Sequence, residues 1–248
     1  MDLQTNTAAL DRLIENLSEA FKTEGKLTPA RAGEILKAAD IQEEDLLPYA
    51  DFDHPVQDCY GRKLVADKGN FEVMVMSWNP GYYSSIHNHG YTQWGALQVF
   101  GHVHHMIYNL KDGKMGFGKM EILPKGSIVK VNNALIHQMG NATTQPYMTL
   151  HVYGANDVDG HVTANASTYE LEFDRMVHTT GGAFFNVQEP EIYDFEDGPV
   201  PTDEVFMHYA AQLMRYYHRQ PQTEEILDLK KRLCVKMEGR MIRERDLA

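Results

Sequence analysis

The sequence predicts a mainly β protein in which a barrel or sandwich of short strands carries helices at both ends. Short segments rich in β-branched and aromatic residues follow one another from about residue 60 to residue 155, and turn signals such as the Asn-Pro-Gly at 79–81 separate them. Apolar residues repeat at helical spacing in the stretches 1–50 and 201–248 instead. The 248 residues suit one compact domain, so we place the barrel at 51–200 between two helical extensions.

Each terminal stretch is expected to form two helices. Apolar residues within 10–21 share one helical face, and Thr28 followed by Pro29 has the pattern of a helix start, a capping residue before a proline. A third helix is expected over 203–219, and a last helix begins near Thr223. These helices are expected to pack on the outside of the barrel or to form an oligomer contact, and the oligomeric state is left open.

Strands fill the centre of the chain. We expect them at 71–76, at 96–108 with an interruption at Gly101, at 120–123, at 127–131 and at 147–153. The acidic, proline-bearing run 189–201 is expected to be an ordered surface loop.

Charge and composition exclude some classes of partner. The formal net charge is −12, which argues against a nucleic-acid surface and against anionic membranes. No apolar run approaches the roughly 20 residues that cross a bilayer, and the first residues lack the basic region of a secretory signal. Cys59 and Cys234 form no framework of spacings, so we expect free thiols and a reducing, cytoplasmic location.

Three histidines form a candidate metal site. His87 and His89 lie two residues apart, so on a strand both imidazoles point to the same side. His137 is available as a third ligand. Three imidazoles leave coordination positions open for a substrate, which is typical of a catalytic rather than a structural metal site. Taken alone, a His-x-His pair is at least as often an accident of sequence as a metal site.

The residues around these histidines match a longer pattern. It consists of Gly-x5-His-x-His at 81–89, glycines at 101 and 126, and His-x3-Asn at 137–141. This resembles the two signature motifs of the cupin superfamily, and it implies a cupin barrel, the double-stranded β-helix or jelly roll. Cupins often carry a glutamate ligand shortly after the second histidine, where this chain has Gln93 and Trp94. The resemblance therefore implies three histidine ligands and no carboxylate.

Four stretches point to one branch of that superfamily. They are Tyr60-Gly-Arg62-Lys-Leu-Val, Trp78-Asn-Pro-Gly81, Ser84-Ser-Ile-His87-Asn-His89 and Thr149-Leu-His151-Val-Tyr153. Their order and spacing resemble the cysteine dioxygenase family over the middle two-fifths of the chain. The resemblance implies a non-haem Fe(II) enzyme, with its iron on His87, His89 and His137, that adds O2 to a small thiol, L-cysteine or a related thiol carboxylate, to give the sulfinic acid.

The resemblance also implies roles for residues near the metal. Arg62 corresponds to an arginine that binds the substrate carboxylate, a task that suits the guanidinium fork, and Tyr60 shares its face. Thr149, His151 and Tyr153 alternate along one strand and so face the same side, and the resemblance implies that they orient the tyrosine hydroxyl toward the iron. Taken alone, Arg62 also fits a surface arginine, and the row also fits a solvated polar face.

Trp94 departs from the family pattern. Some members carry a cysteine at this position, five residues after the second histidine, and link it to the tyrosine. An indole forms no such link, and if it faces the pocket it reshapes the substrate space, so we place Trp94 with the substrate-binding residues. A different metal-dependent cupin enzyme and a non-enzymatic cupin that binds a small molecule remain alternatives. His102, His104 and His105 are expected to face solvent or to stand behind the metal ligands.

Overall fold

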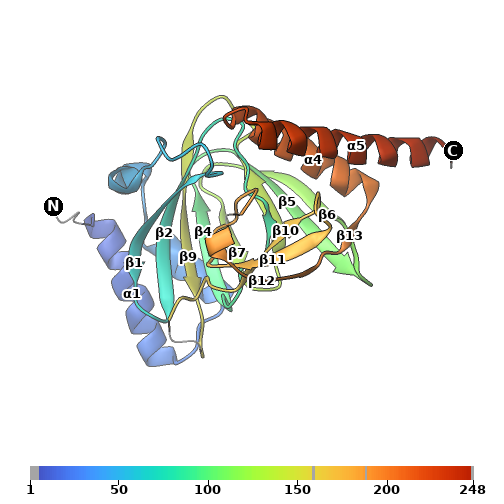
Figure 1. Ribbon diagram of the computed structural model, residues 1–248. Helices are drawn as coiled ribbons and strands as arrows, with labels where there is room; N and C mark the ends of the chain where they lie inside the picture. Colours follow the sequence, from blue (N-terminus) through green and yellow to red (C-terminus); the bar gives the residue numbers. More distant parts are fainter. Residues whose placement is uncertain (1–5, 158–159, 188, 247–248) are drawn as a thin grey trace.

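A computed structural model describes residues 6–157, 160–187 and 189–246, and its centre is a barrel of two facing β-sheets (Figure 1). The strands are β1 (Gly61–Asp67), β2 (Phe71–Trp78), β3 (Ile86–His87), β4 (Trp94–Val99), β5 (Val103–Lys111), β6 (Lys114–Leu123), β7 (Ile128–Val131), β8 (Ile136–Gly140), β9 (Tyr147–Gly154), β10 (Ala166–Glu170), β11 (Arg175–Thr179), β12 (Ile192–Asp197) and β13 (Val200–Pro201). One sheet has the order β1-β2-β9-β4-β7, and the other has the order β12-β11-β10-β3-β8-β5-β6-β13. The predicted mainly β, cupin-type barrel with terminal helices is confirmed.

Helices lie at both ends of the chain, as the sequence predicts. They are α1 (Ala8–Glu24), α2 (Pro29–Ala38), α3 (Glu43–Leu46), α4 (Asp203–Arg219) and α5 (Glu224–Asp246), with short 3-10 turns η1 (Leu47–Tyr49) and η2 (Glu189–Glu191). The hydroxyl of Thr28 caps α2, and Pro29 is its first residue. Among the described helices, none has both the length and the apolar character that spanning a membrane requires.

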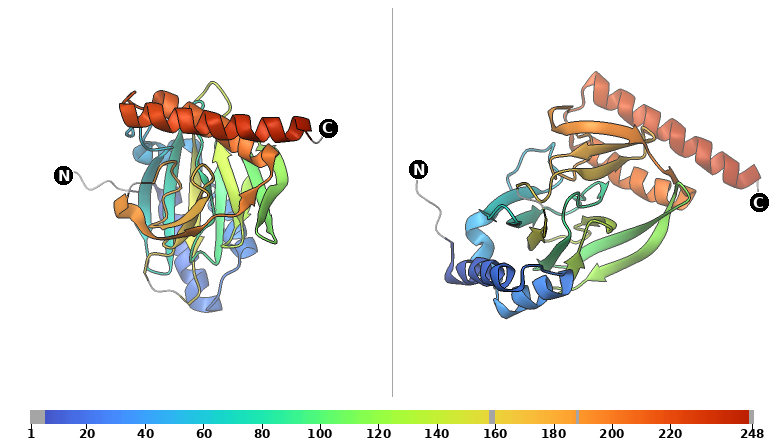
Figure 2. Two further views of the ribbon diagram at one scale, coloured as in Figure 1. Left: turned by 45° about the vertical axis from the view of Figure 1, so that its right-hand side comes forward. Right: turned by 90° about the horizontal axis from the view of Figure 1, so that it is seen from below.

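The N-terminal helices cover the outer face of the five-stranded sheet (Figures 1 and 2). Leu10, Leu13 and Leu17 of α1 are fully buried in this layer. Burying a side chain of this size stabilises the fold by about 1.5–3 kcal/mol. Helices α4 and α5 lie on another side of the barrel, where residues of α4 join the same apolar core as the barrel interior (Figure 2). The two faces of the five-stranded sheet therefore pack against different layers.

The strands differ from the prediction in several places, for example in β6, which begins at Lys114, and in β10 and β11, which were not predicted. The interruption at Gly101 is a change of sheet, because β4 belongs to the five-stranded sheet and β5 to the other. A side-chain carbon at Gly101 would overlap the ring of Tyr147, so the chain passes too close to that ring for any larger residue. The run 189–201 was wrongly predicted to be a loop, because it contains strand β12, which pairs with β11.

Candidate metal centre

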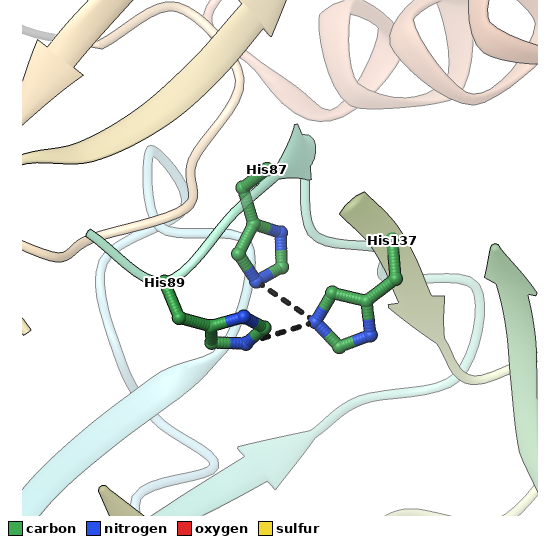
Figure 3. A group of neighbouring side chains, drawn as sticks. All are labelled: His87, His89 and His137. Carbon is green, nitrogen blue, oxygen red and sulfur yellow. Dashed lines mark hydrogen bonds between the residues drawn. The ribbon is translucent and has the colours of Figure 1, made fainter. Parts of the chain in front are cut away.

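Strand pairing brings His87 and His137 together. The two residues stand directly opposite each other where β3 pairs antiparallel with β8, so their side chains share one face of the sheet. His89 follows β3 at the start of a turn. Its ring reaches the same point, and Figure 3 shows the three imidazoles converging. The structure therefore brings the three histidines together, as the sequence predicts.

The spacing of the ring nitrogens fits a metal ion. Nε2 of His137 lies 3.2 Å from Nε2 of His87 and 3.2 Å from Nε2 of His89. Metal–imidazole bonds of about 2.0–2.1 Å at right or tetrahedral angles place two nitrogens about 2.9–3.4 Å apart. Nδ1 of His87 faces the carbonyl oxygen of Ser85 at 3.0 Å and donates its hydrogen there, so its Nε2 carries a lone pair. A cation fits the point where such lone pairs meet.

Burial keeps these rings neutral, as metal ligation requires. It lowers the pKa of His87 to about 4 and the pKa of His137 well below its usual value, and the neighbouring imidazoles lower the latter further. The pKa of His89 falls in the same way. Neutral imidazole is the form that binds a metal, so the site is ready for one at ordinary pH. Among the described residues, His87, His89 and His137 come within 4.8 Å of one another through their possible ligand atoms.

A row of polar side chains runs from the barrel core to the metal site. Nε1 of Trp78 donates to Oγ1 of Thr149 at 2.9 Å, Oγ1 of Thr149 lies 2.7 Å from Nε2 of His151, and Nδ1 of His151 lies 2.7 Å from the hydroxyl of Tyr153. The Thr149 hydroxyl therefore finds its acceptor in His151, whose Nδ1–H is left to donate to Tyr153. This arrangement leaves the hydrogen of the Tyr153 hydroxyl free to point into the pocket. The ring of Tyr153 lies 5.5 Å from that of His89, centroid to centroid.

Comparisons with known proteins match this chain to one family. Residues 5–155, more than half of the chain, match the family described as cysteine dioxygenase type I. The chain belongs to the cysteine dioxygenase type I family. The cysteine dioxygenase type 1 of Danio rerio is 26% identical over 152 residues, which cover 58% of this chain and 73% of that protein. The protein of the same name from Rattus norvegicus is 27% identical over 190 residues, 70% of this chain and 92% of the relative.

Solved structures resemble the barrel more distantly. A cupin-superfamily sugar phosphate isomerase from Silicibacter pomeroyi is 17% identical, with a TM-score of 0.38 over 60% of this chain and 84% of that one. A similarity at this level does not bear on the activity of the chain.

Tyr60 and Arg62, which the sequence analysis expects to bind substrate, line two adjoining cavities. Tyr60 lines the metal pocket, and its hydroxyl accepts a hydrogen bond from the backbone N–H of Ala183 at 3.1 Å. Arg62 lines a second cavity, which meets the first at Thr163. Its guanidinium nitrogen lies 3.5 Å from the Thr163 hydroxyl, and its Nε is buried without a partner. Arg62 therefore has free hydrogen-bonding capacity beside the metal pocket.

A buried carboxylate near Arg62 escaped the sequence reasoning. Glu72 on β2 accepts a hydrogen bond from the Thr163 hydroxyl at 3.0 Å and lines the same cavity as Arg62. Burial raises its pKa, while Thr163 and the charge of Arg62 oppose the rise. Glu72 lies in an alternating strand pattern that also fits a solvent-facing carboxylate, so the sequence gives no sign of its burial.

Trp94 lies elsewhere than expected. The indole is fully buried between the five-stranded sheet and the N-terminal helices, where it packs against Phe71 and over Gly154, and it does not line the metal pocket. The residue opposite Tyr153 across the sheet is Gly95, which carries no side chain. The expectation that Trp94 contacts substrate is therefore wrong. Side chains alternate along β4, so a shift of one residue moves Trp94 to the outer face.

The three histidines at 102–105 have different surroundings. His102 is exposed, as expected. His104 accepts or donates a hydrogen bond with the hydroxyl of Tyr83 at 3.0 Å. His105 is 1% exposed and contacts His137, so it stands directly behind a candidate ligand.

Proposed function

We propose that this chain is an iron-dependent thiol dioxygenase, which oxidises a small thiol carboxylate, L-cysteine or a close relative, to the sulfinic acid. The observation that carries the proposal is the convergence of three neutral imidazoles in a pocket that Tyr153 and Tyr60 also line. Membership of the cysteine dioxygenase family supports the reaction type. The free thiols Cys59 and Cys234 fit the reducing, cytoplasmic location that we propose.

The reaction balances without a further reductant. One thiol and one O2 give one sulfinic acid, so both oxygen atoms end on sulfur and the sulfur supplies the four electrons that reduce them. His87, His89 and His137 would hold a ferrous ion, which would lower the pKa of the substrate thiol and supply the activation of O2.

Side chains around the pocket would position the substrate and donate one hydrogen bond to it. The pocket beside the three imidazoles is lined by Tyr60, Tyr153 and Thr163, so polar side chains surround the place that a substrate would occupy. The unpartnered Nε–H of Arg62 would bind the substrate carboxylate. Glu72 would weaken this binding, because its own carboxyl interacts with the charge of Arg62. Tyr153 would donate its hydroxyl hydrogen to the reacting atoms, since burial holds its pKa well above the usual value and keeps it protonated.

A metal and oxygen assay tests this proposal. Protein loaded anaerobically with ferrous iron should hold about one iron per chain, His137→Ala should hold far less, and His102→Ala, which changes an exposed histidine, should match the wild type. The iron-loaded protein should then consume O2 with L-cysteine or 3-mercaptopropionate. Iron binding without O2 uptake across a panel of small thiols would favour a different metal-dependent activity and refute the proposal.

A further inference from the structure

A chain of hydrogen bonds leads from the protein surface to one of the candidate metal ligands. Nδ1 of His137 lies 2.9 Å from Nε2 of His105, and Nδ1 of His105 lies 3.3 Å from Oε1 of Glu121. The other carboxylate oxygen of Glu121 accepts a hydrogen bond from Nζ of Lys119 at 2.5 Å. Strands β5, β6 and β8 are neighbours in one sheet, and they hold this chain in place.

The direction of the hydrogen bonds follows from what each group can donate. The Glu121 carboxylate, paired with Lys119, only accepts, so Nδ1 of His105 carries the hydrogen and donates to it. Nε2 of a neutral His105 is then an acceptor. The contact with His137 is a hydrogen bond only if Nδ1 of His137 donates, and this leaves the lone pair of His137 on Nε2, the atom that faces the other two ligands.

The other tautomer of His105 would prevent His137 from binding a metal. If Nε2 of His105 carried the hydrogen, it would face Nδ1 of His137 as a donor, and His137 would have to place its own hydrogen on Nε2. That hydrogen would then stand where the metal has to bind. His87 avoids this problem in a simpler way, because its Nδ1 donates to a backbone carbonyl that can only accept. His137 relies on two side chains for the same result.

We propose that Glu121 and His105 are positioning residues that hold His137 in the tautomer able to bind the metal. The proposal rests on the metal-binding part of the proposed function and adds residues to it that touch neither the metal nor the substrate. Carboxylates that orient a ligand histidine directly are a general feature of metal sites, and here an imidazole stands between the two. The side chain of His105 is 1% exposed, whereas that of Glu121 is 26% exposed. A substitution of Glu121 should therefore disturb the core less than a substitution of His105.

The ring nitrogens of the metal-free protein give the first test. The ¹⁵N chemical shifts of histidine rings distinguish the two tautomers, so they report the state of His137 without activity and without any variant. The expected result is hydrogen on Nδ1 of both His105 and His137 at neutral pH. A wild-type spectrum with the hydrogen of His137 on Nε2 would overturn the proposal.

Iron affinity gives the second test. Glu121→Gln replaces an obligate acceptor with an amide that can also donate, and it should weaken the binding of ferrous iron, titrated anaerobically against a chelator, by about 10- to 100-fold. Glu196→Gln is the matched control, because Glu196 on β12 pairs at 3.0 Å with His178 on β11, and the other ring nitrogen of this histidine faces Ser167 instead of a candidate ligand. Equal iron affinity in the two variants would overturn the proposal.

The two proposals fail in different ways. A wild type that binds iron yet oxidises no thiol would refute the proposed function and leave the role of Glu121 intact. If the wild type oxidises thiols and Glu121→Gln binds iron as tightly as the wild type, the proposed function stands and the role of Glu121 is refuted. Thermal unfolding of both variants shows whether a loss of affinity comes from a loss of fold.

Discussion

The hydroxyl of Tyr153 lies 2.7 Å from Nδ1 of His151, and the ring of Tyr153 lies beside that of His89. The buried row behind this pair leaves the hydroxyl hydrogen of Tyr153 directed to the pocket. Burial lowers the pKa of His151 to about 3, so this histidine stays neutral and keeps its place in the row at all ordinary pH values. This geometry supports the proposed role of Tyr153 as a hydrogen-bond donor to the reacting atoms.

Removing that hydroxyl should slow the reaction. Tyr153→Phe keeps the ring and is expected to lower kcat by about 10- to 100-fold, the effect of losing one hydrogen bond to a charged group, worth about 1.5–3 kcal/mol. Steady-state O2 uptake measures it. Tyr216→Phe is the control, since the Tyr216 hydroxyl is also hydrogen-bonded but to the Gln57 carbonyl outside the site. An unchanged kcat in Tyr153→Phe would contradict the assigned role.

Arg62 should matter only for substrates with a carboxylate. Arg62→Ala is expected to raise KM for L-cysteine or 3-mercaptopropionate by about 10- to 100-fold, because a charge-assisted contact is lost. The KM for cysteamine, which lacks a carboxylate, should stay within about twofold. Lys63→Ala serves as the control, since Lys63 forms its ion pair with Asp51 at 3.0 Å instead. Equal effects on both kinds of thiol would argue against carboxylate binding.

Trp94 should affect stability and not substrate binding. Trp94→Phe removes part of a fully buried ring and leaves a cavity beside the N-terminal helices, which is expected to cost about 1–3 kcal/mol of unfolding free energy. Chemical denaturation measures the loss, while KM for the preferred thiol should not change. A changed KM with unchanged stability would contradict this prediction and indicate that Trp94 contacts the substrate.

The pattern of side chains predicted the centre of the site better than its surroundings. Thr149, His151 and Tyr153 alternate along β9, and His87 and His89 lie two residues apart at the end of β3, so the spacing in the sequence alone groups the side chains of each set. Trp94 follows the same alternation, but its phase depends on how the turn after His89 joins β4. A one-residue difference in that turn reverses the face, and a single sequence does not reveal it.

The contacts between residues far apart in the sequence could not be predicted, because no local pattern indicates them. Glu121 and His105 lie 16 residues apart, and Glu72 and Thr163 lie 91 residues apart. His105 meets Glu121 because β5 pairs with β6, and Glu72 on β2 meets Thr163 in a turn that precedes β10 of the other sheet. The sequence analysis also missed β12 within an acidic run, because this strand forms by pairing with β11 and its side chains are largely exposed.

A buried carboxyl that does not line the candidate metal pocket should contribute to the pH dependence of stability. Burial raises the pKa of Glu172 to about 7, and its carboxyl accepts a hydrogen bond from the Tyr209 hydroxyl. A raised pKa means that the folded state holds the proton more tightly. This contribution is therefore complete below about pH 4.5 and is lost as the pH rises through 7.

Glu172→Gln removes this dependence and keeps an acceptor for Tyr209. At pH 8 the variant should be more stable than the wild type by on the order of 3 kcal/mol, and the gain should shrink toward pH 5. Thermal unfolding over this range measures it, with Glu196→Gln, a change at an exposed carboxylate, as the control. Parallel pH profiles of the wild type and Glu172→Gln would show that Glu172 is ionised in the fold.

The fate of the oxygen atoms tests the central claim most directly. Iron-loaded protein should be given its preferred thiol under ¹⁸O2 in unlabelled water, and the product analysed by mass spectrometry. We expect a sulfinate that carries both labelled atoms, with one O2 consumed for each product molecule. Incorporation of one labelled atom or none, or a product formed without O2, would contradict a thiol dioxygenase centred on His87, His89 and His137.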